Sequence, residues 1–286
     1  GLTSHDVVNV VRRLLGTRKV GHTGTLDPMA TGVLVLLIGP ATRLSRFATA
    51  GKKRYRAVVR LGQTTTTYDA EGEVADEHPV DVSIDQIRSE MQAFQGDIQQ
   101  VPPMYAAVRL NGKRLYELAR EGKRVQREPR PVTIYQLEVL SWQRPEIELD
   151  IVCSAGTYIR SLAHDLGQRL GCGAHLKALR RTANGPFTLE DGHTLEELHD
   201  LNTQGTLNSA LLPPHAVLNE MPITVVSESE EQAIRYGQQV SITPTSQVDI
   251  GDLVQARDQD DHLVAVLVKL DTGHFQPKVV FPRPIE

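Results

Sequence analysis

The chain has 286 residues, of which 40% are hydrophobic and 23% charged, a composition typical of a globular protein with one large domain or two. Its formal net charge of -4 excludes a globally basic nucleic-acid binder, and its two cysteines offer no disulfide framework of a secreted protein. No apolar run approaches the roughly 20 residues that a membrane helix needs. We therefore expect a cytoplasmic protein that does not engage a membrane.

The first third of the chain predicts two amphipathic helices and two strands. A hydroxyl cap, apolar residues at helical spacing and a closing glycine predict a helix over 3–16. A loop follows, then a buried strand or helix start over 32–38 and a strand over 55–61. Ser83 caps a second helix, which extends to Phe94.

The middle of the chain predicts an insertion of different character, followed by two paired strands. Residues 99–131 begin with Pro102-Pro103, contain a short basic helix over 115–122, and end at a second proline pair. Alternating patterns predict strands over 132–139 and 147–154, and an apolar stripe predicts a helix over 158–170.

The last third begins with a linker and is rich in acids. The linker-like pairs Pro213-Pro214 and Met221-Pro222 place a domain boundary between 211 and 222. Short strands are expected beyond it, with a turn at 258–261, and residues 221–286 carry 10 acids against five Lys and Arg. The expected strands cover 239–242, 253–256, 263–270 and 278–281.

Basic residues collect elsewhere. Residues 7–60 contain 11 Lys and Arg and a single acid, Asp27, and residues 103–135 contain eight against three acids. Such segregation favours a one-sided surface for a polyanion, because phosphate attraction depends on local potential.

Asp27 lies within the small-residue loop Gly21-His-Thr-Gly-Thr-Leu-Asp27-Pro28. Asp-Pro and Gly-Thr are common turn dipeptides, so the loop can be a plain turn. A held carboxylate beside a polyanion surface can instead act as base, nucleophile or metal ligand. We expect Asp27 to stay ionised, because nearby cations favour the charged form.

Four blocks in this order resemble the TruB family of bacterial tRNA pseudouridine-55 synthases. They are the stretch from His22 to Leu34, Lys53-Arg-Tyr-Arg56, Gly156-Thr-Tyr-Ile-Arg160, and Gly171-Cys-Gly-Ala-His175 with Leu179-Arg-Arg181. The resemblance implies an α+β pseudouridine synthase fold, with a mixed, mainly antiparallel central sheet and flanking helices.

The resemblance also implies two domains. Residues 1–215 would form the catalytic domain, in which the insertion at 99–131 is a thumb that folds onto RNA. Residues 220–286 look like a PUA domain, a small β-barrel that often follows RNA-modifying domains. Because this copy is acidic, its RNA contact should be small or confined to one edge.

The implied activity is the isomerisation of uridine 55 in the TΨC loop of tRNA to pseudouridine. The reaction involves no redox change and needs no cofactor. The sequence shows no dinucleotide fingerprint and no zinc spacing, so we expect no metal. The implied partner is the TΨC stem-loop of tRNA, bound by a monomer.

The resemblance assigns the central roles to three residues. Asp27 would trap C1′ of the ribose or remove a proton at C2′, and the sequence leaves both routes open. Tyr55 would stack on the flipped base, or else pack in the core. Arg160 would hold Asp27 as a bidentate partner, or else lie on a helix surface.

Four further residues match positions around the uridine. Tyr158 and Leu179 would line the pocket, although a Leu is more often a core residue. His22 would fill the gap that flipped bases leave in the RNA loop. Asp69 would bond a polar edge of the base, or serve as a turn residue before Gly72.

Two rival functions remain at this point. One is the guide-RNA-dependent synthase of archaea and eukaryotes, which shares the Asp loop. The other is an RNA-folding chaperone whose catalytic competence is incidental. The thumb region and the short chain favour the stand-alone enzyme.

Overall fold

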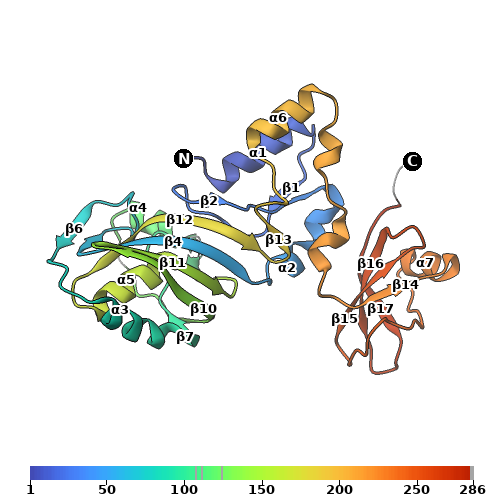
Figure 1. Cartoon of the computed structure of the whole chain (residues 1–286). Coiled ribbons are helices and arrows are strands. Elements are labelled where there is room, and N and C mark those ends of the chain that lie inside the picture. The colour runs from blue at the N-terminus through green and yellow to red at the C-terminus, as the bar shows by residue number, and fades with distance from the viewer. Residues whose placement is uncertain (107, 111, 124, 284–286) are drawn as a thin grey trace. The chain divides into compact units, whose positions relative to one another are not determined.

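A computed structural model describes residues 1–106, 108–110, 112–123 and 125–283. The chain forms two compact units (Figure 1). The first unit contains Gly1–Thr3, Leu26–Val33 and Ala50–Gly192, and the second contains Ser4–Thr25, Leu34–Thr49 and His193–Glu286. These units are groups of residues in mutual contact, and they do not correspond to the predicted domains 1–215 and 220–286. The boundary between those domains stays a prediction.

A seven-stranded sheet forms the centre of the first unit. Every pairing is antiparallel except that of β2 with β12, so the mixed, mainly antiparallel sheet is confirmed. The strands are, in order across the sheet, β13 (Phe187–Thr188), β12 (Ala174–Asn184), β4 (Lys53–Leu61), β11 (Glu146–Cys153), β10 (Arg130–Gln143) and β7 (Gly96–Gln100), with β2 (Thr31–Gly32) beside β12.

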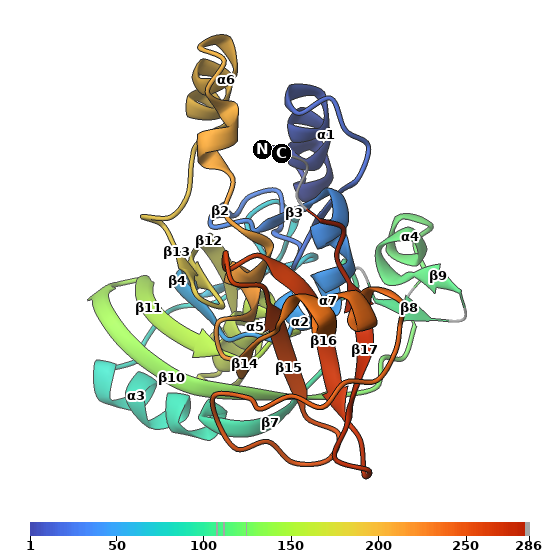
Figure 2. The ribbon, with the colours of Figure 1, turned by 90° about the vertical axis from the view of Figure 1, so that its right-hand side faces the viewer.

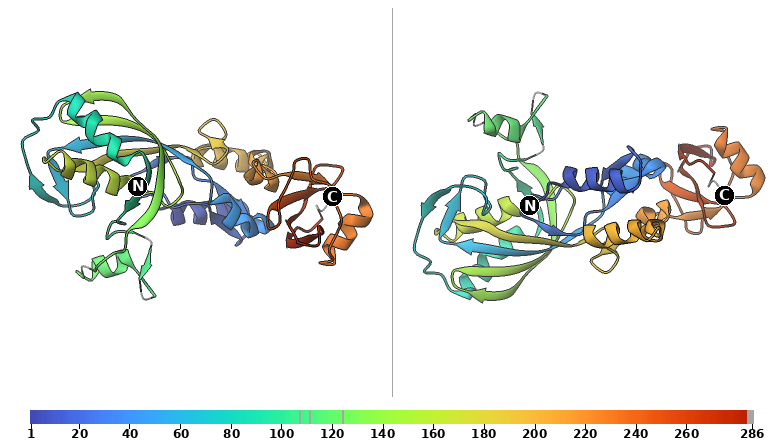
Figure 3. Two further views of the ribbon diagram at one scale, coloured as in Figure 1. Left: turned by 90° about the horizontal axis from the view of Figure 1, so that it is seen from below. Right: turned by 90° about the horizontal axis from the view of Figure 1, so that it is seen from above.

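Alternation along β4 divides the sheet into a buried and an open face. Every second residue from Lys53 to Leu61 is buried. This face packs against α3 (Ile84–Met91) and α5 (Ile159–Arg169), both on the same side of the sheet (Figures 1 and 3). The predicted cap at Ser83 is confirmed and takes the form of a capping box. The apolar stripe predicted for 158–170 is buried at Ile159, Leu162, Ala163 and Leu166.

Smaller elements surround the sheet of the first unit. The thumb region carries a hairpin and a short helix that project away from the sheet (Figure 3). The thumb elements are β8 (Arg109–Leu110), β9 (Lys113–Arg114) and α4 (Leu115–Arg120). Outside the thumb lie β5 (Gln63–Thr65), β6 (Val74–Glu77) and η2 (Gln92–Phe94).

The predicted strand over 32–38 is wrong. The apolar run is split, because Gly32 pairs with β12 in the first unit whereas β3 (Leu36–Ile38) pairs with β1 (Val20–His22) in the second. The predicted first helix is confirmed as α1 (Ser4–Leu14), and Gly16 follows it with a φ of 60°.

The rest of the second unit contains short helices and a C-terminal sheet. Its helices are η1 (Gly39–Leu44), α2 (Ser45–Ala48), α6 (Leu195–Thr203), η3 (Leu207–Ala210), η4 (Pro214–Leu218) and α7 (Glu228–Arg235).

The C-terminal sheet has four strands, in the order β14 (Ile223–Val225), β15 (Leu253–Arg257), β16 (Leu263–Lys269) and β17 (Phe275–Val280), and α7 lies beside it (Figure 2). The predicted strand over 239–242 is reduced to one bridge, in which Val240 exchanges two backbone hydrogen bonds with Phe275. The described residues form an open sheet, without a closed barrel.

Two apolar clusters support the C-terminal sheet. One lies wholly within residues 226–280. The other joins Leu263 and Phe281 to Leu44 and Leu218, so this sheet shares part of its core with earlier segments of the second unit. None of the helices in the described part of the chain is both long and apolar enough to span a bilayer.

Candidate functional site

Asp27 lies in a turn that is anchored to the core of the first unit. Its carbonyl oxygen accepts the Ala30 N–H at 2.9 Å, and Leu26, Met29 and Ala30 pack against the main apolar cluster. The Asp27 side chain itself is 29% exposed. The loop is therefore a turn, as its dipeptides indicate, and this turn presents a carboxylate at the edge of the core.

Arg160 holds this carboxylate from the first turn of α5. Its buried guanidinium donates from Nη2 to Asp27 Oδ1 and to the Tyr105 carbonyl, both at 2.8 Å. Its Nη1 donates to Asp69 Oδ2 at 3.2 Å and to the Thr67 carbonyl at 3.3 Å. The expected Asp27–Arg160 pair is present, but it is not bidentate, because Arg160 divides its donors between two carboxylates.

Asp69 is a buried member of this network. Its Oδ1 accepts the Thr67 hydroxyl at 2.5 Å and the Glu71 N–H at 3.1 Å, as in a side-chain-stabilised turn. Its Oδ2 faces Arg160. The structure therefore shows the turn contacts of Asp69 and a link to Arg160, and a contact with the base stays a prediction.

The charge balance at Asp27 differs from the expectation. Burial raises the pKa of Asp27 above its ordinary value and is the largest effect; the Arg160 charge counters it, and the Asp69 charge adds to it. The sequence shows the surrounding cations but not the desolvation of Asp27 in the folded chain. Arg160 thus favours the charged form of Asp27 and opposes the effect of burial on its pKa.

Tyr55 and Leu179 lie on neighbouring strands, within the same apolar cluster as the Asp27 turn. They are 6% and 7% exposed, respectively. Burial raises the pKa of Tyr55 to about 12, so its hydroxyl is protonated at neutral pH. Both residues therefore pack in the core, which was the alternative prediction for each. The residues of the Asp27 turn pack against the same apolar cluster.

Tyr158 directly precedes α5, two residues before Arg160. Gln100, at the end of β7, fixes it: the Gln100 side chain accepts the Tyr158 N–H at 2.7 Å and donates to the Tyr158 carbonyl at 3.0 Å. Burial raises the pKa of the Tyr158 hydroxyl. Sequence reasoning missed Gln100 and Tyr105, because each contacts its partner only after folding brings distant segments together.

His22 is the one predicted site residue that belongs to the second unit. It ends β1, and its Nδ1 accepts the Gly24 N–H at 3.3 Å. Its role beside Asp27 stays a prediction.

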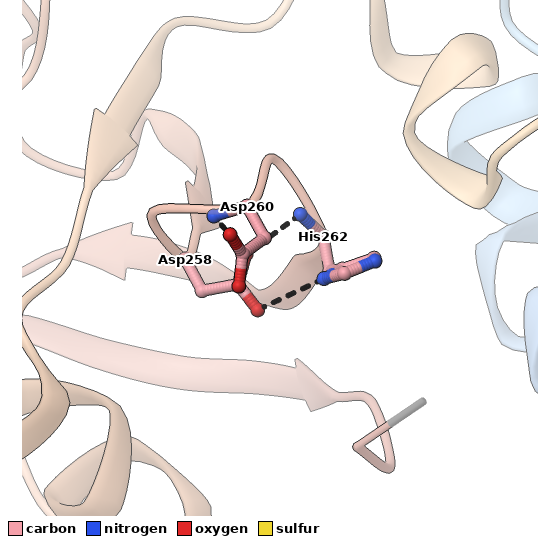
Figure 4. A group of neighbouring side chains, drawn as sticks. All are labelled: Asp258, Asp260 and His262. Carbon is pink, nitrogen blue, oxygen red and sulfur yellow. Dashed lines mark hydrogen bonds and ion pairs between the residues drawn. The ribbon is translucent and has the colours of Figure 1, made fainter. Parts of the chain in front are cut away.

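Among the described residues, one group has the side chains for a metal site. Asp258, Asp260 and His262 lie together on the turn between β15 and β16 (Figure 4). Asp258 Oδ1 accepts the backbone N–H groups of Asp260 and His262 at 3.0 and 2.8 Å. These bonds are those of an ordinary acidic turn, which was predicted here, and we assign it no metal.

Comparison with known proteins identifies the family. Residues 12–159 match the N-terminal domain of the TruB family pseudouridylate synthases, and residues 160–219 match the C-terminal domain of tRNA pseudouridylate synthase B. The chain belongs to the TruB family of pseudouridylate synthases.

The chain is also similar to individual members of this family. The chain is 42% identical over 281 residues to tRNA pseudouridine synthase B of Stutzerimonas stutzeri, covering 97% of this chain and 91% of that protein. It is 43% identical to that of Solibacter usitatus, covering 98% and 96%.

A solved H/ACA RNP bound to a substrate RNA containing 2'-deoxyuridine has a similar fold, with a TM-score of 0.77 at 28% identity over 99% of this chain and 83% of that one. A Cbf5-Nop10-Gar1 complex gives 0.75 at 31% identity over 94% and 75%.

The pH dependence of this TruB-family enzyme should depend on Arg160. In Arg160→Gln the counter-charge is lost, the Asp27 pKa rises further, and less carboxylate is ionised at a given pH. The acid limb of the single-turnover rate should move to higher pH, and the rate at neutral pH should fall about a hundredfold through misorientation. Arg169→Gln, on the exposed end of the same helix, is the matched control. An acid limb that stays in place would contradict this account.

Stability should also respond to pH through Lys53, whose amine is buried in β4. Burial and the nearby Arg181 charge lower the pKa of Lys53 to about 8. The unfolded chain then binds more protons than the folded one between about pH 8 and 10.4, so the unfolding free energy should rise with pH in this window. Urea titrations at pH 7.5 and 9.5 should show a gain of about 1–2 kcal/mol that Lys53→Met lacks. Lys52→Met, at the exposed neighbour, should keep the gain; its loss there as well would refute the assignment.

Proposed function

We propose that this protein isomerises uridine 55 in the TΨC loop of tRNA to pseudouridine, as a stand-alone enzyme. The observation that carries the proposal is a carboxylate, Asp27, held by the buried Arg160 beside Tyr55 and Tyr158. It occurs in a chain that is 42% identical over nearly its whole length to a tRNA pseudouridine synthase B.

The reaction breaks the bond between uracil N1 and ribose C1′ and joins C5 to C1′. An ionised carboxylate can attack C1′, or it can remove a proton at C2′. Both routes need the charge and the orientation that Arg160 imposes on Asp27. No electron is gained or lost, so the proposed reaction needs no hydride cofactor.

Access to C1′ requires that the uridine leave the base stack. The Tyr55 ring would stack on the flipped base, and Tyr158 and Leu179 would line its pocket. His22 would occupy the gap left in the RNA loop. Asp69 would act mainly through Arg160, by holding the second half of its guanidinium.

The proposed RNA surface comprises the basic first third of the chain and the thumb at 99–131. Residues 220–286 would form a PUA-like domain with a small RNA contact, and the family matches end at residue 219. We further propose a cytoplasmic monomer; the buried free thiols of Cys153 and Cys172 fit a reducing compartment.

The guide-dependent alternative receives less support. The structural relatives include an H/ACA RNP, but this chain is 28% identical to it and covers 83% of that chain. The identity to tRNA pseudouridine synthase B of Solibacter usitatus is 43%, and 96% of that protein is covered. The stand-alone enzyme is therefore the proposal.

Asp27→Asn tests the catalytic assignment. An amide keeps the shape of the side chain but can neither trap C1′ nor remove a proton. We expect no detectable pseudouridine in an unmodified tRNA transcript, with a normal melting transition and tRNA affinity at or above wild type. Asp85→Asn, at an exposed acid of α3, should remain active. Substantial isomerisation of U55 by Asp27→Asn would show that Asp27 is not the catalytic residue and that the loop is a plain turn.

Thumb cations should determine part of the salt dependence of tRNA binding. Combined charge reversal at Lys113, Arg114 and Lys123 should flatten the log–log slope of affinity against salt, by roughly 0.9 for each duplex phosphate that is no longer bound and about 0.7 for each single-stranded phosphate. Lys278→Glu in the acidic C-terminal region should leave the slope nearly unchanged. Filter binding from low to high salt measures both. An unaltered slope in the thumb variant would remove the thumb from the RNA surface.

A further inference from the structure

Arg181 is an arginine placed where arginine is rarely found. It lies on β12 and is 1% exposed, and it is the largest of the fully buried side chains among the described residues. Arginine is seldom fully buried unless its donors have defined acceptors. One acceptor is the Val33 carbonyl, which receives the Arg181 Nε–H at 2.7 Å.

A second contact of Arg181 is with Tyr55. The two residues are direct partners in the antiparallel pairing of β12 with β4, so their side chains project to the same, buried face. Both residues are buried, and the Arg181 guanidinium lowers the pKa of the Tyr55 hydroxyl, against the larger opposing effect of burial.

The third contact joins Arg181 to the end of the Asp27 loop. Its carbonyl accepts the Val33 N–H at 2.8 Å, so backbone and side chain of Arg181 both bind Val33. Gly32 pairs with Arg181 in parallel, with a φ of 98°, and a Cβ there would lie 2.1 Å from the Arg181 carbonyl oxygen. The strand that leaves the Asp27 turn is thus in close backbone contact with Arg181.

We propose that Arg181 is a positioning residue for the isomerisation: its buried guanidinium fixes the Tyr55 hydroxyl and the end of the Asp27 loop relative to each other. The proposal rests on the proposed function. In this proposal Arg181 acts through Tyr55 and through Val33.

A lysine at position 181 could not reproduce these contacts. The planar guanidinium offers separate donors in a fixed geometry, one for the Val33 carbonyl and others for the hydroxyl. A single ammonium carries the same charge without that geometry. The defect should appear in the chemical step, because misplacement of reacting groups by about 1 Å costs about a hundredfold in rate.

A double-mutant cycle tests the proposal in the full-length protein. Arg181→Lys should lower the single-turnover rate of pseudouridine formation about a hundredfold, while the Kd for tRNA stays within about threefold. In a Tyr55→Phe background the same substitution should cost clearly less, because the hydroxyl is already gone. Arg180→Lys, at the exposed neighbour, is the matched control. An unchanged rate in Arg181→Lys, or equal rate reductions in both backgrounds, would overturn the proposal.

A melting measurement covers the case in which Arg181→Lys does not fold. Tyr55→Phe alone removes a polar partner of the Arg181 guanidinium on the buried face, and it should lower the Tm by about 2 °C or more. An unchanged or higher Tm would show that the hydroxyl has no such partner, and would overturn the proposal. This measurement needs no activity. Absence of product from the wild-type enzyme would count against the proposed function instead.

Discussion

Arg160 is a cation with 6% of its side chain exposed, and such a group is stable only when its charge and its donors are matched. The molecule meets most of this need: two carboxylates and two carbonyls from three separate segments accept the Nη donors, and the buried Nε has no hydrogen-bond partner in the described part of the chain. Removing one partner from a buried ion pair typically costs about 3–5 kcal/mol. The same contacts fix the orientation of Asp27 and oppose the rise in its pKa, so stability and reactivity have a common origin.

The central sheet supplies the rigid frame for this network. Tyr55 and Leu179 come from adjacent strands, β4 and β12, and β2 carries the exit of the Asp27 turn along β12. On the other side, Gln100 ties the start of α5 to β7, which fixes the residues just before Arg160. Each functional side chain therefore projects from, or next to, a regular element whose register is determined by backbone hydrogen bonds.

Much of this fold could be predicted from local patterns. The alternation in 55–61 and the apolar stripe of 158–170 correspond to β4 and α5 with small shifts at their ends. Asp27 could be singled out as the lone acid in a basic region. The strand predicted over 32–38 was wrong, because the hydrophobicity of this run does not indicate that its two ends pair with different strands. The Arg160–Asp69 pair, 91 residues apart, and the burial of Arg181 depend on tertiary packing, which a single sequence does not encode in any local pattern.

The central claim is that this chain alone recognises a tRNA and isomerises one uridine. The most direct measurement uses the purified protein, with no guide RNA and no accessory protein, and an unmodified tRNA transcript. Pseudouridine is then mapped at single-nucleotide resolution. The account predicts conversion at position 55 and at no other uridine. Conversion only after addition of a guide RNA, or conversion at other positions, would contradict it.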